Sequence, residues 1–321
     1  MSFRTVIAAG LLGLVPALAC AAQLLVLNKG EATLSFIDTE SGKTVETIAT
    51  GQGPHEIELS SDGKTAFVTN YGAQTDGNTI SVIDLVARKE LRRIDLGELK
   101  RPHGMTIADG RLYFTAERAK KIGRLDAKGE RVDWTFATDQ DVTHMVLAAP
   151  SGDVLYTTNI QSNTVSAIER NANGEWKQTL IHVGAGPEGL DLSPDGKQLW
   201  VAHSRDGGIS IIDTATKKVV DTIDAETRRS NRLKFSRDGK TVLVSDLGAG
   251  SLVAIDAVSR KVRARTNLGR APTGVLIHPS DNRAYVALSG ENRIAVVDIA
   301  SLEVLESIAT GAGPDGMAWV P

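Results

Sequence analysis

The fold is decided by a short stretch, Thr79-Ile80-Ser81-Val82-Ile83-Asp84, in which a mainly apolar run ends at an acid that opens a turn. The same ending, a hydrophobic residue followed by Asp or Glu, occurs seven times, with acids 42 to 46 residues apart: Asp38, Asp84, Asp126, Glu169, Asp213, Asp256 and Asp298. A fixed period in the forties indicates one repeated supersecondary unit, and a propeller blade of four strands has this length.

The segment after Pro54 contains one whole unit. Residues 55–59 and 65–69 alternate as strands around a hairpin turn at Asp62-Gly63-Lys64, where glycine accepts positive φ and aspartate caps the local backbone. Two further strands are expected at residues 79–83 and 90–96. The hairpin signal recurs as Asp109-Gly110, Ser151-Gly152, Asp195-Gly196, Asp238-Gly239 and Asp281-Asn282.

The number of blades follows from where the units begin. We place the blade starts at Pro54, Pro102, Val142, Pro187, Ser230, Pro272 and Pro314. Pro314 is followed by one strand, whereas residues 24–27, 33–37 and 44–49 form three strands that lack a first. We therefore predict an all-β, seven-bladed β-propeller with four antiparallel strands per blade, its ring closed by one C-terminal and three N-terminal strands. Ring closure leaves no long exposed sheet edge.

The first 22 residues have the pattern of an export signal. Arg4 is followed by an apolar run over residues 6–18 and by a small-residue cleavage site at Ala19-Cys20-Ala21. We therefore expect a periplasmic or secreted protein in which residues 23–321 form a single propeller domain. Cys20 is the only cysteine and offers the alternative of a lipoprotein, which is less favoured because Ala17 stands where leucine is usual. No other segment approaches the ~18 apolar residues of a membrane span.

The bulk composition argues against some partners. The formal charge is −3, so the chain has no basic excess of the kind that grips nucleic acid or anionic lipid. Aromatic residues make up 4% of the chain, too few for a surface on which bases or sugars stack. We expect a monomer whose partner is a small-molecule ligand or a periplasmic protein.

The repeats also carry a family resemblance. Ala66-Phe67-Val68-Thr69-Asn70 and Leu155-Tyr156-Thr157-Thr158-Asn159 resemble the Tyr-Val-Thr-Asn repeat of the YVTN β-propellers, the YncE-like family, and degenerate copies stand at residues 200–203 and 285–288. The resemblance covers residues 23–321 and implies the propeller fold and an exported prokaryotic protein. Its motifs are structural, and the group includes DNA-binding, cell-surface and redox-associated proteins, with lactonases among related propellers. It implies no single function.

Most of the histidines are expected on one rim of the ring. Loops that lead into first strands share this rim with loops that join second to third strands, and four of the six histidines map to it. Imidazoles together with a carboxylate are ligands that zinc, copper or iron accepts. We predict one transition metal ion at the channel mouth, with these candidate ligands: His55, His103, His144, Glu188 and His203.

A simpler alternative is that these histidines bond to backbone and line a watery channel. Strand alternation favours it, because His55 lies two residues before the inward Ile57, whereas His144 lies one residue before Met145. On that reading His144 points away from His55 and His103, unless the backbone is irregular at this blade start.

The same rim holds other candidates for ligand binding: Tyr71, Arg118, Asn159, Arg205, Arg232, Asp246 and Asp315. Its arginines could receive a phosphate, a carboxylate or single-stranded nucleic acid. Acids are almost as numerous nearby, so solvated loop charge is the alternative.

Three functions remain open from sequence. The first is a binding module that uses the histidine-bearing rim for a ligand, a metal or a partner. The second is a metal-dependent or lactonase-like enzyme in which Glu188 or His203 acts as general base. The third, single-stranded nucleic-acid binding, is less favoured. No Gly-x-Ser-x-Gly, His-Glu-x-x-His or Cys-x-x-Cys motif is present.

Overall fold

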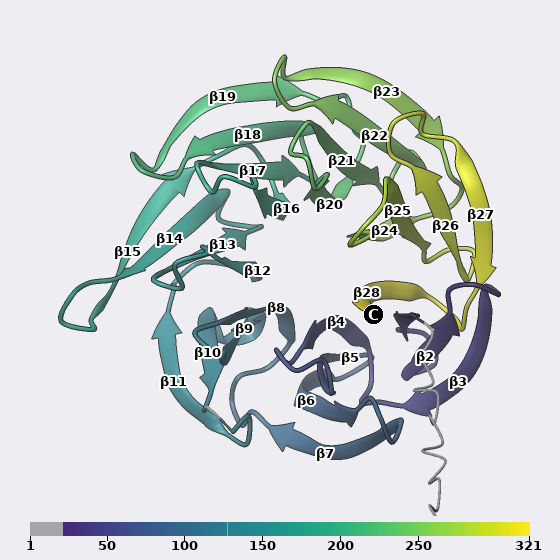
Figure 1. The fold of residues 1–321 in the computed structure, drawn as a ribbon. Coiled ribbons are helices and arrows are strands. Elements are labelled where there is room, and N and C mark those ends of the chain that lie inside the picture. The colour runs from purple at the N-terminus through teal and green to yellow at the C-terminus, as the bar shows by residue number, and fades with distance from the viewer. Residues whose placement is uncertain (1–21, 127) are drawn as a thin grey trace, which may run out of the picture.

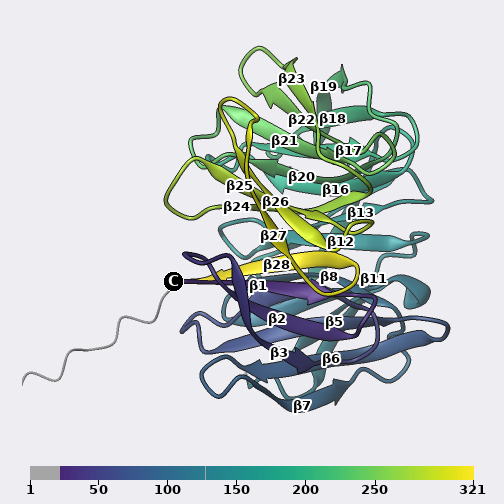
Figure 2. The same cartoon turned by 90° about the vertical axis from the view of Figure 1, so that its right-hand side faces the viewer.

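The computed structural model describes residues 22–126 and 128–321. Residues 1–21, which include most of the expected export signal and Cys20, lie outside the described residues. In the described part, seven sheets of four antiparallel strands stand around a central axis, which confirms the predicted architecture. Figure 1 looks down this axis, and Figure 2 shows the same sheets from the side.

Three blades follow one another from the first blade start, each running from its innermost to its outermost strand. Blade 1 contains β4 (Pro54–Leu59), β5 (Thr65–Gly72), β6 (Asp76–Asp84) and β7 (Lys89–Asp95). Blade 2 contains β8 (Pro102–Ala108), β9 (Arg111–Ala116), β10 (Lys121–Leu125) and β11 (Val132–Ala137), with the short 3₁₀ helix η1 (Glu117–Ala119) after β9. Blade 3 contains β12 (Thr143–Ala148), β13 (Val154–Asn159), β14 (Thr164–Arg170) and β15 (Trp176–His182).

The next three blades repeat the arrangement. Blade 4 contains β16 (Pro187–Leu192), β17 (Gln198–His203), β18 (Gly208–Asp213) and β19 (Lys218–Asp224). Blade 5 contains β20 (Ser230–Phe235), β21 (Thr241–Asp246), β22 (Ser251–Asp256) and β23 (Lys261–Asn267). Blade 6 contains β24 (Pro272–Ile277), β25 (Arg283–Leu288), β26 (Arg293–Asp298) and β27 (Val304–Ala309).

Blade 7 closes the ring with strands from both ends of the described chain. It contains β28 (Pro314–Val320) as the innermost strand, followed by β1 (Gln23–Asn28), β2 (Thr33–Asp38) and β3 (Lys43–Ala49). β28 pairs antiparallel with β1, with Trp319 opposite Leu24 and Met317 opposite Val26. This is the closure predicted from the repeat count.

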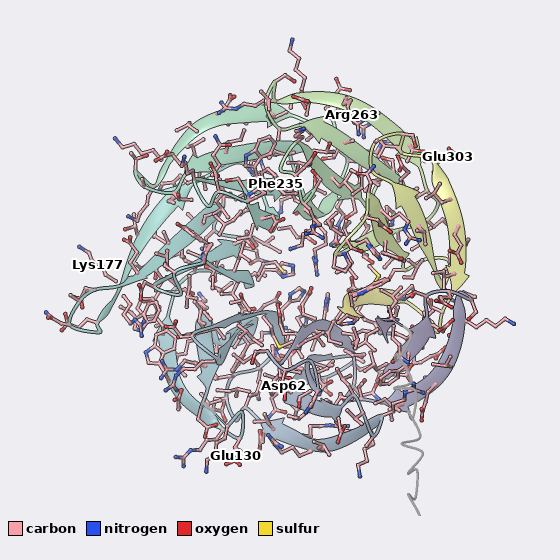
Figure 3. All side chains as sticks on the ribbon, in the orientation of Figure 1. Asp62, Glu130, Lys177, Phe235, Arg263 and Glu303 are labelled. Carbon is pink, nitrogen blue, oxygen red and sulfur yellow. The ribbon has the colours of Figure 1, made fainter. Side chains whose placement is uncertain are left out.

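The cores lie between neighbouring blades. Trp200 of blade 4 is fully buried and meets Phe235 of blade 5 edge-on, with ring centroids 5.4 Å apart. Charged side chains such as Lys177, Arg263 and Glu303 project outward from the outermost strands, while Phe235 lies among the inner ones (Figure 3). Because each blade buries both of its faces, apolar burial holds the ring together without a disulfide.

Every blade begins with a bulge in its first strand. In blade 1, Pro54 pairs with Asn70 and Ile57 pairs with Val68, so two residues, His55 and Glu56, stand opposite the single residue Thr69. Equivalent shifts occur at the starts of β8, β12, β16, β20 and β24 and within the pairing of β1 with β28. A bulge lets consecutive side chains point in directions that plain alternation forbids.

The blade start proposed at Val142 is wrong by one residue. β12 begins at Thr143, which pairs with Asn159 as Pro54 pairs with Asn70. Val142 instead occupies the position of Gly53, and it has a φ of 56°. Positive φ is strained for a β-branched residue, so sequence patterning gave no reason to expect it there.

No helix among the described residues is both long and apolar enough to span a bilayer.

We expect Val142→Gly to stabilise the fold. Glycine accepts a φ of 56° without a Cβ clash, and relief of that strain exceeds the added entropy of the unfolded chain by about 1 kcal/mol. Urea unfolding would measure the change. The matched control is Gly53→Ala, where φ is 61° and a Cβ would lie 2.2 Å from the carbonyl oxygen of Gly72, so stability should fall. A destabilised Val142→Gly variant would contradict the assignment of strain.

Candidate functional site

The second residue of every first strand forms a ring around the channel mouth. We call these seven residues, which are equivalent through the strand register, the mouth ring: His55, His103, His144, Glu188, Asn231, Thr273 and Asp315. The bulge at each blade start gives them a common orientation. His144 therefore lies in register with His55 and His103, because the irregularity that the three histidines require is present in all three blades.

Threonine hydroxyls hold the backbone of the mouth ring through hydrogen bonds. Thr69 Oγ1 accepts the N–H of Glu56 at 3.1 Å and donates to the carbonyl of His103 in the next blade at 2.9 Å. Thr115 repeats the contact toward the carbonyl of His144 at 2.5 Å. The backbone that carries these histidines is thus bonded to the neighbouring blade as well as to its own.

The three histidines lie side by side at the mouth. The ring centroids of His55 and His103 are 3.9 Å apart, and those of His103 and His144 are 3.7 Å apart. Nε2 of His55 lies 3.1 Å from Nε2 of His103. His103 is 1% exposed and His144 is 8% exposed, so the cluster is largely withdrawn from solvent.

An acid holds the outer histidine of this stack. Nδ1 of His144 lies 2.6 Å from Glu117 Oε1, and the other carboxylate oxygen accepts the hydroxyl of Tyr71 at 2.6 Å. Arg101 donates to the Tyr71 oxygen at 3.0 Å. Because the carboxylate accepts, the proton of His144 resides on Nδ1 and leaves the Nε2 lone pair free.

A second acid stands beside His55. Asp315 Oδ2 lies 3.2 Å from Nδ1 of His55 and 2.8 Å from Nζ of Lys29, whose Nζ is also 3.5 Å from Nε2 of His55. Lys29, Tyr71 and Glu117 occupy one equivalent position in three neighbouring blades, since each backbone N–H donates to the carbonyl that precedes a blade start. These three residues surround the histidine stack.

Burial keeps the central histidines neutral. It lowers the pKa of His55, against the opposing effect of the Asp315 carboxylate. It holds the pKa of His103 well below its usual value, and the neighbouring histidines and Arg232 add to this effect. Both imidazoles therefore keep a lone pair at neutral pH, which is the form that binds a metal.

The acids remain ionised despite burial. Burial would raise the pKa of Glu117, but bonding to His144 and Tyr71 holds it below the usual range. Lys29, His55 and Arg232 likewise outweigh burial and keep the pKa of Asp315 low. Burial and the Glu117 carboxylate raise the pKa of Tyr71 to about 12, so this residue stays a hydrogen-bond donor.

Two overlapping groups of side chains could hold a metal ion within the described residues. The first is His55, Glu56 and His103, and the second is His103, Glu117 and His144. Two nitrogens bound to one zinc ion at tetrahedral angles lie about 3.3 Å apart. The 3.1 Å between the Nε2 atoms of His55 and His103 is close to that spacing. In the absence of metal, the same distance accommodates one N–H···N hydrogen bond.

The two remaining predicted ligands lie elsewhere. Glu188 belongs to the mouth ring, but its Oε1 accepts the side-chain amide of Asn231 at 2.6 Å. His203 ends β17 at the position of Asn70 and bonds to Asp206 at 3.0 Å. Neither is a member of the two groups described above. The geometry concentrates the candidate ligands on blades 1 to 3.

The other predicted rim residues divide by burial. Tyr71 and Asp315 contact the histidine cluster directly. Asn159 and Asp246 are buried and bond to their own loops, Asn159 to Thr164 and Asp246 to the backbone of Arg228. They hold the loops in place.

The three candidate arginines do not form a common patch. Arg118 is 63% exposed and pairs with Asp76, Arg205 is exposed, and Arg232 is buried against Glu56 inside the channel.

Sequence reasoning missed Glu56 and did not single out Lys29 or Glu117. Alternation predicted one inward residue at each blade start, whereas the bulge admits both His55 and Glu56. Tyr71 was among the predicted rim residues, and Lys29 and Glu117 stand at the equivalent position of blades 7 and 2.

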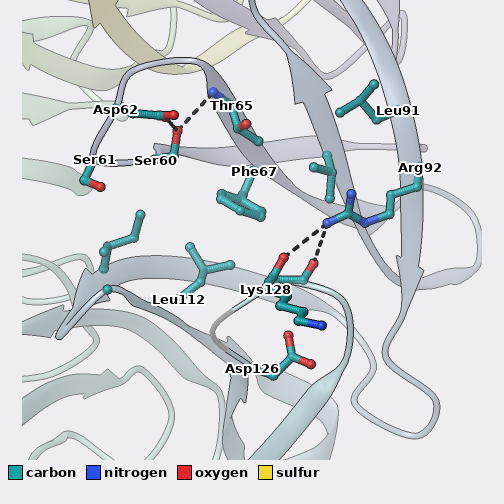
Figure 4. A pocket seen from close by; sticks show the side chains of 14 residues that line it. Ser60, Ser61, Asp62, Thr65, Phe67, Leu91, Arg92, Leu112, Asp126 and Lys128 are labelled. Atoms are coloured by element: carbon teal, nitrogen blue, oxygen red, sulfur yellow. Dashed lines mark hydrogen bonds between the residues drawn. The ribbon is translucent and has the colours of Figure 1, made fainter.

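A separate cavity of about 490 Å³ lies between blades 1 and 2, at the hairpin turns of the opposite rim (Figure 4). Phe67 and Leu112 line it, and Arg92 donates to the carbonyl oxygens of Lys128 and Gly129. The Asp62 carboxylate accepts the hydroxyl of Ser60. Because these polar groups already have partners, this cavity lacks the convergent free donors of the mouth.

The fold and site together define a seven-bladed propeller with a buried histidine and carboxylate cluster at its channel mouth. Residues 108–283, more than half of the chain, match the family described as YNCE-like beta-propeller. The chain belongs to the YncE-like β-propeller family.

Relatives of known sequence support the same assignment. The chain is 22% identical over 301 residues to the uncharacterized protein YncE of Salmonella typhimurium, covering 88% of this chain and 84% of that protein. It is 25% identical over 231 residues to Antigen Lp49 of Leptospira interrogans, covering 65% of this chain. The aligned region spans 50% of the length of Antigen Lp49.

Among solved structures, the Pseudomonas aeruginosa periplasmic gluconolactonase has the same fold. It superposes with a TM-score of 0.74 at 18% identity, covering 94% of this chain and 99% of that one. At this identity the likeness concerns the fold alone.

Because the pKa of His103 is lowered in the folded protein, we expect this residue to make the free energy of unfolding fall as the pH decreases. Its pKa in the folded protein lies well below 6.5, the ordinary value, so in mild acid the unfolded chain binds a proton that the folded chain does not. The stability contributed by the neutral imidazole is therefore present above about pH 6.5 and is lost as the pH falls below it. From pH 7.5 to 5.5 this loss is on the order of 1 kcal/mol.

Urea unfolding of the wild type and His103→Gln at both pH values, with EDTA present, measures this contribution. Between the two pH values, the free energy of unfolding should fall less for the variant than for the wild type, by on the order of 1 kcal/mol. An identical pH dependence in the two proteins would show that His103 titrates normally.

Proposed function

We propose that this chain is an exported propeller that binds one transition metal ion at its channel mouth and uses it to hold a small ligand. The observation that carries the proposal is the 3.1 Å separation of Nε2 of His55 and Nε2 of His103, two neutral imidazoles grouped with Glu56, whose Oε1 lies 3.8 Å from Nδ1 of His55. Zinc, copper and iron accept two imidazoles and a carboxylate, and a ligand from solution would fill the remaining position.

Buried nitrogen atoms without partners favour a ligand-binding cluster over a purely structural one. Nδ1 of His55, Nδ1 of His103 and Nε2 of His144 are buried and lack a hydrogen-bond partner among the described residues, in addition to the two Nε2 atoms that lie 3.1 Å apart. A buried nitrogen without a partner is costly unless it serves a ligand. The Glu117 carboxylate, 2.6 Å from Nδ1 of His144, resembles the outer partners that orient metal-binding imidazoles.

Lys29 tunes this site. Its ammonium lies between His55 Nε2 and Asp315, where its positive charge opposes a cation. Binding of a metal would move the ammonium toward Asp315, which already accepts it. The proposed site is therefore selective for ions that bind imidazole strongly, and Mg²⁺ or Ca²⁺ should not compete.

The export pattern of residues 1–22 supports a periplasmic or secreted location for this activity. In that compartment the bound ligand would be a small molecule or an exposed group of a periplasmic protein.

Metal binding is tested on the mature chain purified without a histidine tag, stripped with EDTA and reloaded separately with zinc, copper or iron. Elemental mass spectrometry should find about one equivalent in the wild type and a loss of that ion in His55→Ala/His103→Ala. His182→Ala is the matched control, because His182 is exposed on the outer strand β15. A free metal concentration of 100 times the Kd should raise the free energy of unfolding by about 2.7 kcal/mol.

Two results would refute the metal site. One is a wild type that takes up no ion and gains no thermal stability from any of the three metals. The other is equal uptake by the double variant, which would place the metal elsewhere.

A second candidate function is hydrolysis of a lactone. It is favoured by the pair of His144 and Glu117, since an imidazole held by a carboxylate with its Nε2 free has the arrangement of a general base. The propeller named as a gluconolactonase above shares the fold and lends this candidate further support.

The hydrolase candidate is tested with glucono-δ-lactone in a pH-stat, with the spontaneous rate subtracted. A general base contributes about 100-fold or more, so Glu117→Gln and His144→Ala should each lower the rate by at least about that factor. His182→Ala should leave it unchanged. A wild-type rate equal to that of buffer, with and without zinc, would exclude this activity toward that lactone.

A further inference from the structure

A single ion pair spans the channel directly below the mouth ring. Arg232 of β20 donates from Nη2 to Glu56 Oε1 of β4, and these two strands lie on opposite sides of the central opening (Figure 1). Each residue follows a mouth-ring residue within a bulge, at a position where four other blades have glycine: Gly104, Gly189, Gly274 and Gly316. At the four glycines a Cβ would meet the backbone of the next blade, so only Glu56, Arg232 and Met145 of blade 3 carry a side chain at this level.

Glu56 takes part in two arrangements that compete for its negative charge. It is a member of the group formed with His55 and His103, and it is the carboxylate that neutralises Arg232. A carboxylate oxygen bound to a metal ion is a weaker acceptor for a guanidinium, because the metal withdraws its charge. Metal binding at the mouth therefore weakens the partner that Arg232 has in the described structure.

Arg232 cannot remain unpaired without cost. Its side chain is 7% exposed, and a buried charge that loses its partner is strongly unfavourable. Nη1 bonds weakly to the carbonyl of Asn231 at 3.4 Å, which leaves donors of the guanidinium fork for another acceptor. The simplest replacement for Glu56 is an anion from solution.

A cavity for such an anion is already present. Glu56 and Arg232 line a channel cavity of about 400 Å³ whose other walls are largely apolar and include Met105, Leu190 and Met317. Its size suits a small molecule, and its walls suit a hydrocarbon body rather than a hydrated ion. Lys234 and Glu58 also line this cavity, and burial raises the pKa of Glu58 to about 7, so this acid is only partly ionised at neutral pH.

We infer that the channel is an anion site for a small organic monocarboxylate, which binds to Arg232 when the metal ion draws Glu56 away. For its trigger this inference rests on the metal site proposed above. A monoanion fits better than a dianion, because Asp315 and Glu188 already share the field of Arg232. A guanidinium binds a carboxylate with two parallel hydrogen bonds, and the apolar walls receive the carbon chain.

The metal and the carboxylate are then coupled. If the metal raises the affinity for the carboxylate by some factor, the carboxylate raises the affinity for the metal by the same factor. The anion site can also be opened without any metal, by removing the negative charge of Glu56. This gives a test of Arg232 that is independent of the mouth.

The experiment measures the affinity of the full mature chain for butyrate by isothermal titration calorimetry, first in EDTA and then with one equivalent of zinc. Glu56→Gln in EDTA should bind butyrate at least tenfold more tightly than the wild type in EDTA. Zinc should produce a gain of similar size in the wild type. Glu58→Gln is the matched control, because it removes an acid of the same channel that does not pair with Arg232 in the described structure.

Glu56→Gln/Arg232→Gln removes both partners, so no single buried charge is left to unfold the protein. This double variant should return to the weak binding of the wild type in EDTA, with thermal unfolding confirming that it is folded. The anion site is overturned if Glu56→Gln gains nothing, if the double variant binds as tightly as Glu56→Gln, or if Glu58→Gln shows the same gain. Tighter binding of inorganic phosphate than of butyrate by Glu56→Gln overturns the monocarboxylate class.

These measurements distinguish a failure of the metal site from a failure of the anion site. A wild type that takes no zinc, while Glu56→Gln binds butyrate, refutes the metal site and supports the anion site. Zinc uptake at the mouth, without any gain in butyrate affinity in Glu56→Gln, supports the metal site and refutes the anion site. Butyrate binding by Glu56→Gln, together with zinc uptake that leaves wild-type butyrate affinity unchanged, overturns the coupling alone.

Discussion

The hydroxyl of Thr69, which bonds to two blades at once, is the contact on which the candidate site depends. It accepts the N–H of Glu56 in its own blade and donates to the carbonyl of His103 in the next. Without it, the extra residue of the bulge would leave a buried N–H and a buried carbonyl unpaired, at a cost of about 1–3 kcal/mol each. The threonine of the Tyr-Val-Thr-Asn pattern is thus what permits two consecutive side chains, His55 and Glu56, to face the channel.

That bulge also marks the boundary of what the sequence could predict. The period of the acids and the Asp-Gly turns predicted the ring and its closure, because these depend on local backbone preferences repeated seven times. The side of the ring on which the histidines gather followed from topology. The direction of His144 did not, since alternation assumes a regular ladder and Val142 adopts a φ that its residue type disfavours. The pairing of Glu56 with Arg232 was also hidden, because it joins blades far apart in sequence.

The electrostatics of the mouth follow from its burial. Neutral imidazoles occupy the centre, and the charged residues Asp315, Lys29 and Glu117 lie around them. Each of these three has a partner of opposite charge or a hydrogen-bond donor. A cation at this site would meet no repulsion from charged imidazoles, whereas the Lys29 ammonium beside His55 would oppose it. The opposite rim differs, because the polar groups around Phe67 are already engaged with one another.

Closure of the ring by β28 has a consequence for the order in which the protein matures. Asp315, which faces Nδ1 of His55, lies on the strand of the ring that a ribosome makes last, whereas Lys29 follows the strand made first. Until β28 pairs with β1, the mouth has an open seam and His55 lacks its outer carboxylate. The cluster is therefore assembled in the same event that completes the fold. A nascent chain does not present the finished histidine cluster, so a ligand of that cluster meets it only after the last strand has paired.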